Sequence, residues 1–185
     1  MDELLPVVDK TGKVIGKEYR SVLHKSPDLI HPVVHAWIFN KKGQVLLQQR
    51  SLQKDTSPGY WDMSCGGHIK YKDTPIKTLE RELQEELGIM SYKYIYRLIE
   101  KYVFSSQKQS ELIYLYYVVI KDEMPASQFT LQKSEVEQVQ WMNYEEILEK
   151  ALNNEIKVTR WVFTQLPKIY RKTFVDCIIK EHKIV

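Results

Sequence analysis

The sequence predicts an α+β fold in which a sheet lies between helices. Segments of alternating apolar and polar residues, rich in Val, Ile and Tyr, are interspersed with segments of helical periodicity, which is typical of layered sheet and helix domains. The chain has 185 residues, of which 43% are hydrophobic, enough for one globular core. Its two cysteines argue against a disulfide scaffold and against a cysteine-rich zinc module. We therefore expect a single domain over residues 1–185.

The first part of the chain predicts a hairpin, a short helix and two strands. Apolar and polar residues alternate over residues 5–16 around a turn at Gly12, which indicates a β-hairpin. A short helix is expected at 18–25. Strands are expected at 33–39 and 44–50, because a polar turn that ends in glycine separates the two segments.

The clearest helix is expected at residues 75–87. Thr74 or Asp73 can cap its first turn, and a proline at position 75 suits the start of a helix. Gly88 suits its end, because glycine adopts the left-handed conformation that closes a helix. The other segments are expected to form strands near Trp61 and at 92–104, 111–121 and 137–142, and helices at 143–152 and 159–181.

The charge and the hydropathy pattern exclude several classes of partner. Lys and Arg number 27 and Asp and Glu 24, a net charge of +3 that is too small to predict nucleic-acid binding. The N-terminal decapeptide is acidic and mixed, unlike a signal or transit peptide. Apolar stretches of about ten residues are too short to span a bilayer. We expect a cytoplasmic protein that binds neither nucleic acid nor membrane.

The helix at 75–87 carries a cluster of carboxylates. Glu82, Glu85 and Glu86 stand at positions i, i+3 and i+4, so they share one face. A hard divalent cation, Mg²⁺ or Mn²⁺, would relieve their mutual repulsion, and such cations usually act beside substrate phosphates. The alternative is a solvated acidic face supported by Arg81 and Lys77.

The residues before this helix favour the metal site. Gly66 and Gly67 precede it, and glycine lets the backbone approach a ligand closely. Five residues separate Gly67 from Asp73, and seven separate Asp73 from Arg81. This spacing resembles the Nudix box, which has a glutamate at the position that Asp73 occupies in this chain. The chain matches the box at Gly67, Arg81, Glu82, Leu83, Glu85, Glu86, Gly88 and Ile89.

The resemblance implies a Nudix-type α/β/α sandwich with a mixed central sheet and a loop–helix–loop catalytic element at 67–89. An N-terminal hairpin and short helix at 1–30 and C-terminal helices at 143–181 would complete the domain. The implied activity is metal-dependent cleavage of a diphosphate linkage in a nucleoside diphosphate derivative or a related X-diphosphate. The implied metal ligands are Glu82, Glu85 and Glu86.

Nearly the whole chain also resembles the isopentenyl-diphosphate isomerase branch of this superfamily and the hydrolases that share its framework. That likeness implies a second metal site at His24, His31 and His68 with two acidic residues. One acidic position matches Glu111, but the other matches Gln109, so the ligand set is incomplete. Without the likeness, these histidines would be interpreted as ordinary loop or surface residues.

The same likeness implies substrate contacts. Arg20, Arg50 and Lys54 match basic positions that hold the substrate diphosphate, and arginine can grip phosphate oxygens in pairs. Gly67 would bring the backbone to the ligand. Trp161 matches an aromatic residue that shields a carbocation, although a tryptophan there is more often a packing residue.

The position of the isomerase's catalytic cysteine separates the two activities. In an ungapped alignment that position is Gly66, and Cys65 comes one residue early, so a strand would turn it to the opposite face. Isomerisation needs a proton donor and an acceptor on opposite sides of the substrate. We therefore favour hydrolysis, with the isomerase as the alternative and a non-catalytic nucleotide sensor as a third possibility.

The remaining expectations concern the reaction and the assembly. Metal-assisted attack of water at phosphorus is expected, with a small-molecule diphosphate as the partner. A monomer and a homodimer are both compatible with the sequence. The general base is left open among Glu82, Glu85, Glu86 and Glu111.

Overall fold

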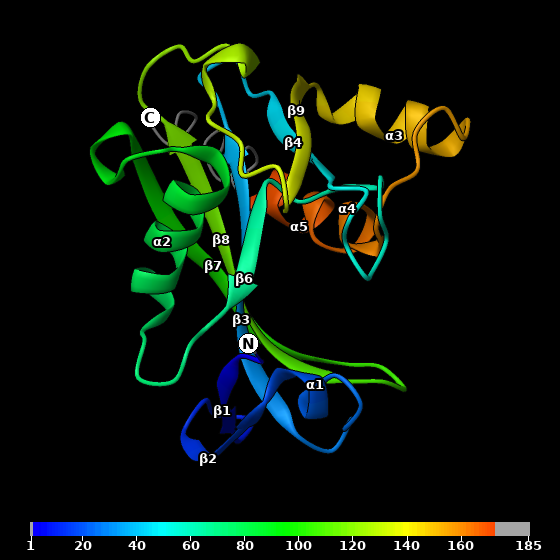
Figure 1. Ribbon diagram of the computed structural model, residues 1–185. Helices are drawn as coiled ribbons and strands as arrows, with labels where there is room; N and C mark the ends of the chain where they lie inside the picture. The colour runs from blue at the N-terminus through cyan, green and yellow to red at the C-terminus, as the bar shows by residue number, and fades with distance from the viewer. Residues whose placement is uncertain (1, 173–185) are drawn as a thin grey trace, which may run out of the picture.

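The computed structural model describes residues 2–172, which form a nine-stranded sheet with helices on either side (Figure 1). The strands are β1 (Leu4–Val8), β2 (Val14–Tyr19), β3 (Ile30–Phe39), β4 (Val45–Arg50), β5 (Trp61–Asp62), β6 (Cys65–His68), β7 (Tyr94–Ser105), β8 (Ser110–Ile120) and β9 (Val136–Met142). The α-helices are α1 (Arg20–Leu23), α2 (Pro75–Leu87), α3 (Tyr144–Leu152), α4 (Arg160–Thr164) and α5 (Leu166–Tyr170). Single 3₁₀ turns, η1 (Ser91–Lys93) and η2 (Ala126–Gln128), complete the elements.

The long strand β3 organises the sheet. It pairs in parallel with β8 along its whole length and antiparallel with β6, and it touches β1 and β4 at its two ends. The sheet is therefore mixed, which confirms the predicted α+β class. In Figure 1 the N-terminal hairpin β1–β2 and α1 extend from one end of the sheet.

Alternation along β3 divides the core into two layers. Val34, Ala36 and Ile38 are buried on the side of α2, together with Leu79 and Leu83 of that helix. The intervening residues of β3 face the other layer, which includes buried residues of α3, α4 and α5. Figure 1 shows α2 on one side of β3, β7 and β8 and the C-terminal helices on the other. This arrangement confirms the predicted sandwich.

Both ends of α2 follow the sequence signals. The Thr74 hydroxyl accepts a hydrogen bond from the Lys77 amide at 3.2 Å, so Thr74 rather than Asp73 is the cap. Gly88 adopts φ +69°, and its amide donates to the Gln84 carbonyl. The helix that carries the acidic cluster is thus held at both ends.

The C-terminal helix expected at 159–181 is different in the structure. α4 ends at Thr164 and a separate helix, α5, begins at Leu166, because Pro167 has no amide hydrogen to donate and its ring would collide with the carbonyl of the preceding turn. The part of the expected helix from residue 173 onward lies outside the described residues.

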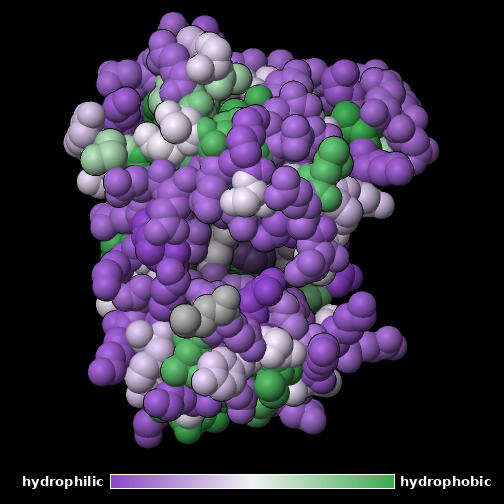
Figure 2. Space-filling model, in the orientation of Figure 1, coloured by the Kyte–Doolittle hydropathy of each residue, from purple (hydrophilic) through white to green (hydrophobic). Residues whose placement is uncertain are grey.

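The expected helix at 18–25 is shorter in the structure, because β2 continues to Tyr19 and α1 is a single turn. Among the described residues, no helix is long and apolar enough to cross a membrane. The face in Figure 2 is mostly hydrophilic, and it is hollowed between the N-terminal hairpin and the rest of the domain.

Candidate active site

Burial separates the three carboxylates of α2. Glu86 and Glu82 are buried, with 5% and 9% of their surface exposed, whereas the Glu85 side chain is half exposed. Arg81 binds Glu82 at 2.8 Å and Glu85 at 3.1 Å. The cluster predicted as one face therefore contains an inner pair, Glu82 and Glu86, and an outer member.

The inner pair is costly to ionise without a cation. Burial raises the pKa of Glu86 to about 8, and the nearby charge of Glu82 adds to the effect. Burial also raises the pKa of Glu82 to about 7, against the opposing influence of Arg81. One oxygen of Glu86, Oε2, is buried without a hydrogen-bond partner among the described residues. Buried carboxylate oxygens of this kind fit a hard divalent cation.

Gly67 stands against this pair. In β6 it lies opposite Val34, so it faces the α2 layer. A Cβ at position 67 would lie 2.0 Å from Oε1 of Glu82. Only a glycine leaves room here, and the close approach brings the β6 backbone beside the carboxylates.

The two residues of β6 that precede Gly67 show which way the cysteine side chain points. Cys65 lies opposite Ala36 and is buried in the α2 layer, where its thiol is hydrogen-bonded to Glu86. Burial raises the pKa of the Cys65 thiol well above its ordinary value. Gly66 lies opposite His35 and faces the other layer, and no bulge interrupts the register. The expected one-residue offset is therefore present.

Three histidines come together on the side opposite α2. His24 follows α1, His31 lies in β3 and His68 ends β6, and one nitrogen of each lies within 4.8 Å of the others. His24 Nε2 is 3.0 Å from His68 Nε2, whereas neither nitrogen of His31 has a partner among the described residues. Burial lowers the pKa of His24 to about 4 and of His31 to about 3, so both rings are neutral, as metal ligands must be.

Glu111 lies beside this cluster. It pairs with His31 in the parallel register of β3 and β8. Its Oε1 accepts a hydrogen bond from the Gln109 amide at 2.7 Å, and its Oε2 is buried without a partner. Burial raises the pKa of Glu111 to about 7, and the charge of Asp62 adds to this effect. Gln109 thus donates to Glu111 at the place where the isomerase branch has a second acid.

The predicted basic residues occupy different surroundings. Arg50 binds Asp62 at 3.2 Å and also donates to Thr56, so part of its guanidinium is already engaged. The Lys54 ammonium lies 2.6 Å from Glu135. Arg20, in α1, is close enough to the histidine cluster to lower the pKa values of His24 and His31.

Asp62 and Glu135 are the acidic neighbours that sequence analysis missed. Asp62 is 5% exposed, burial raises its pKa, and it accepts a 2.5 Å hydrogen bond from the Thr159 hydroxyl. A lone aspartate between Trp61 and Met63 in an apolar segment was the available signal. Glu135 had no comparable signal, because it precedes β9 in a polar turn.

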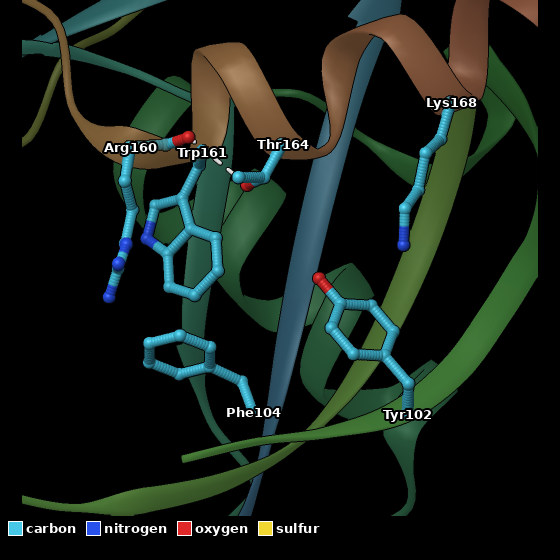
Figure 3. A pocket seen from close by; sticks show the side chains of 6 residues that line it. All are labelled: Tyr102, Phe104, Arg160, Trp161, Thr164 and Lys168. Atoms are coloured by element: carbon cyan, nitrogen blue, oxygen red, sulfur yellow. Dashed lines mark hydrogen bonds between the residues drawn. The ribbon is translucent and has the colours of Figure 1, made fainter. Parts of the chain in front are cut away.

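Trp161 lines a pocket of about 350 Å³ on the same side of the sheet as the histidines (Figure 3). Phe104 and Tyr102 of β7 form the facing wall, and the Trp161 and Phe104 rings meet edge to face at 4.9 Å. Arg160 and Lys168 flank these aromatic rings, each within 4.8 Å of a ring centre. Phe104 pairs with Glu111 across β7 and β8, so the pocket adjoins that carboxylate.

Comparisons with known proteins identify the family of the chain. Nudix hydrolase 3 of Arabidopsis thaliana is 38% identical over 153 residues, which cover 78% of this chain but only 20% of that protein. An isopentenyl-diphosphate Δ-isomerase of Serratia proteamaculans is 27% identical over 168 residues, or 89% of each chain. A crystal structure of a Deinococcus radiodurans protein has the same fold, with a TM-score of 0.70 at 23% identity over 88% of this chain and 96% of that one. The family profile described as the NUDIX domain matches residues 29–162, and the chain therefore belongs to the Nudix family.

Proposed function

We propose that this chain is a metal-dependent hydrolase that cleaves a diphosphate linkage in a nucleoside diphosphate derivative or a related X-diphosphate. The observation that carries the proposal is the buried pair Glu82 and Glu86 against the Gly67 backbone. Their raised pKa values and the unpartnered Glu86 oxygen favour the binding of a divalent cation. Mg²⁺ or Mn²⁺ is the proposed ion, with Glu85 as the outer ligand.

The residues of the chain have distinct proposed tasks. A bound divalent ion supplies charge neutralisation for the diphosphate and acidifies the attacking water. Glu82 and Glu86 hold that ion, and Gly67 keeps the space beside them open. Arg50, Lys54 and Arg20 hold the phosphate oxygens as charge develops on them.

Arg50 is the best prepared of these cations. Asp62 and Thr56 engage three of its nitrogen atoms, which fixes the plane of the guanidinium. Arginine has five N–H donors, so two remain for a phosphate oxygen. Lys54 must exchange its contact with Glu135 for a phosphate, and the Arg20 side chain makes no ion pair among the described residues.

Hydrolysis is proposed over isomerisation because of Gly66. The position that faces the histidines and Glu111 carries no side chain, and Cys65 is turned into the α2 layer, hydrogen-bonded to Glu86. A proton donor at the isomerase's cysteine position is therefore missing. Water attack at phosphorus needs no such donor.

The histidine cluster nevertheless supports a second candidate, isopentenyl-diphosphate isomerase. His24, His31 and His68 can hold a metal ion beside Glu111, whose raised pKa suits proton transfer near neutral pH. This candidate needs another donor in place of the cysteine. Both candidates take a small-molecule diphosphate, and monomer and homodimer are equally compatible with them.

Two assays separate the candidates. The hydrolase should release phosphate or a nucleoside monophosphate from a panel of nucleoside diphosphate derivatives with Mg²⁺, and Glu86→Gln should lower the rate at least a hundredfold. The isomerase should incorporate deuterium from heavy water into isopentenyl diphosphate. Deuterium exchange without release from any panel member would replace the first candidate by the second. Comparing pH–rate profiles of Glu82→Gln, Glu85→Gln and Glu111→Gln then identifies the general base.

A further inference from the structure

The first described residues of the chain are tied to helix α1, next to the histidine cluster. The Asp2 carboxylate accepts hydrogen bonds from the Ser21 hydroxyl at 2.6 Å and from the Ser21 amide at 3.3 Å. The Glu3 carbonyl accepts from the Arg20 amide at 2.8 Å, and β1 begins at the next residue. Because α1 ends directly before His24, the same short helix positions both Glu3 and His24.

The Glu3 carboxylate reaches one member of the histidine cluster. Its Oε2 lies 3.5 Å from Nδ1 of His68, a distance that suits an ion pair and is long for a hydrogen bond. The Glu3 side chain is 31% exposed and the His68 side chain 19%, so water screens the contact only in part. The carboxylate thus acts on the nitrogen of His68 that points away from His24.

This contact decides where a neutral His68 ring carries its proton. A bare Nδ1 would set its lone pair against the lone pairs of the carboxylate oxygen, whereas a protonated Nδ1 is attracted to that oxygen. The proton therefore belongs on Nδ1, and Nε2 keeps its lone pair. A metal ion binds histidine through such a bare nitrogen.

The tautomer of His68 in turn fixes that of His24. Their Nε2 atoms lie 3.0 Å apart, which requires a proton on one of them and a lone pair on the other. Since Nε2 of His68 is bare, Nε2 of His24 donates to it in the metal-free protein. The two nitrogens of His31 have no partner among the described residues, so this order of protons begins at Glu3.

We propose that Glu3 is a positioning residue for a divalent cation at the histidine cluster, because its carboxylate keeps the proton of His68 on Nδ1 and leaves Nε2 for the ion. A carboxylate behind a histidine ligand fixes the orientation of the ring and raises its basicity. The inference concerns the histidine side of the sheet and does not rest on the proposed hydrolysis.

A purely structural ion pair would behave differently. It would stabilise the fold by the same amount with or without an ion, and exposed or half-buried pairs of this kind contribute about 1 kcal/mol at most. A positioning role instead makes the affinity of the cluster for a cation depend on Glu3. Cation affinity and the tautomer of His68 are therefore the quantities to measure.

The first test measures Mn²⁺ binding by calorimetry in a Glu86→Gln background, in which the acidic site of α2 is impaired. Glu3→Gln removes the charge with little change of volume, and we expect it to raise the Mn²⁺ dissociation constant about tenfold. Glu3→Asp keeps the charge and should lose less affinity. Equal affinity of Glu3→Gln and the parent, or no Mn²⁺ binding by the parent, would overturn the inference.

A matched control guards against a general effect of charge on the N-terminal hairpin. Glu18→Gln makes the same substitution in β2, where the carboxylate accepts from the Tyr19 amide, and should change the dissociation constant by less than about twofold. Circular dichroism and thermal unfolding of each variant show whether the fold is kept. A loss of affinity as large in Glu18→Gln as in Glu3→Gln would contradict a specific role for Glu3.

The second test detects the protons themselves. ¹⁵N NMR spectra of the wild type in EDTA, recorded at pH 8 where an ordinary histidine is neutral, distinguish protonated from bare ring nitrogens. We expect a protonated Nδ1 in His68 and a protonated Nε2 in His24, and both tautomers of His68 in Glu3→Ala. A bare Nδ1 in wild-type His68 would overturn the inference. Neither test needs turnover, so a failure of the hydrolase proposal would leave this inference standing.

Discussion

Individual acidic residues that look equivalent in the sequence have different roles in the fold. Glu82, Glu85 and Glu86 all match the box pattern, yet two are buried and the third is half exposed. Helical spacing predicts which side chains share a face, but the width of the buried stripe depends on what packs against it. Here the Gly67 backbone lies close against the Glu82 carboxylate, and the Cys65 thiol is hydrogen-bonded to Glu86. The unequal burial of the three carboxylates is a property of the assembled layers.

The first prediction concerns the charge of Glu86. Burial raises the pKa of folded Glu86 to about 8, from an ordinary value of 4.5 for glutamate. Between these values the folded state binds more protons, so the free energy of unfolding falls as pH rises. Glu86→Gln removes this loss, and we expect it to be more stable than the wild type by about 2 kcal/mol at pH 9. Denaturant titrations with EDTA measure this, and the difference should shrink towards pH 4.5.

A control distinguishes this effect from a general change of charge. Glu80→Gln alters an exposed residue of the same helix and should leave the pH dependence unchanged. Added Mg²⁺ should stabilise the wild type and reverse its order with Glu86→Gln. A variant less stable than the wild type at pH 9 in EDTA would contradict the assignment of Glu86 as a buried, costly charge.

The second prediction concerns the space beside Gly67. A Cβ at this position would overlap Oε1 of Glu82, so Gly67→Ala must displace that carboxylate. We expect at least a tenfold loss of hydrolysis, comparable to other changes that misplace a metal ligand. Gly16→Ala is the matched control, because its Cβ would lie 3.8 Å from the nearest atom, in Val7. Full activity of Gly67→Ala, with unchanged circular dichroism, would contradict the model of a cation held at Glu82.

At the scale of elements, the short strand β6 positions most of the site. Its residues alternate between the two layers, so Gly67 meets the carboxylates of α2 while Gly66 and His68 face the histidine side. The capped first turn of α2 fixes where the helix begins, and so where its carboxylates lie relative to β6. A shift of one residue in β6 would exchange the contents of the two sides.

The third prediction tests how the capped turn fixes α2. Thr74→Ala removes the hydroxyl that accepts from the Lys77 amide, and we expect it to lower the free energy of unfolding by about 1 kcal/mol. Thr164→Ala removes an exposed hydroxyl within a helix and should change it by less than about 0.5 kcal/mol. Chemical denaturation measures both, and equal effects would show that the cap contributes nothing specific.

Sequence patterns predict the bounds of the elements better than they predict which residues come into contact in the fold. The helix at 75–87 was predicted with its correct bounds, because proline, threonine and glycine mark its ends. The break before Pro167 was missed because the amphipathic period continues through it. The acids Asp62 and Glu135 acquire their importance from contacts with Arg50 and Lys54, which only the folded chain brings together.

On the scale of the whole molecule, the proposed cation sites lie on opposite sides of β6. Glu82 and Glu86 lie in the α2 layer, whereas the side chains of His24, His31 and His68 lie on the other side. Arg81 binds Glu82 and also donates to the backbone carbonyl of His68, but the two sets of candidate ligands have no member in common. Because the two ligand sets are distinct, we expect their contributions to stability to be nearly additive. The two sides of the sheet can therefore be loaded and tested separately.

The fourth prediction follows from this separation. With saturating Mn²⁺, His31→Ala should keep only the stabilisation from the acidic site, and Glu86→Gln only that from the histidine site. The double variant should show neither. Denaturant titrations should give a wild-type gain equal to the sum of the two single-variant gains within about 0.5 kcal/mol. A gain in the double variant would locate the ion elsewhere.

The alternation of β6 has a consequence for how reaction types can diverge within one scaffold. A Cβ at Gly66 would lie 3.1 Å from both the Met63 sulfur and the Val34 carbonyl oxygen, so a side chain there requires a small local adjustment, and it would face away from α2. Alternate residues of β6 thus face two separate environments, the carboxylates of α2 on one side and the histidine cluster on the other. A substitution on the face of β6 that meets the histidines leaves the residues that meet α2 in place. The same strand can therefore keep the proposed diphosphate site while the residues on its other face change.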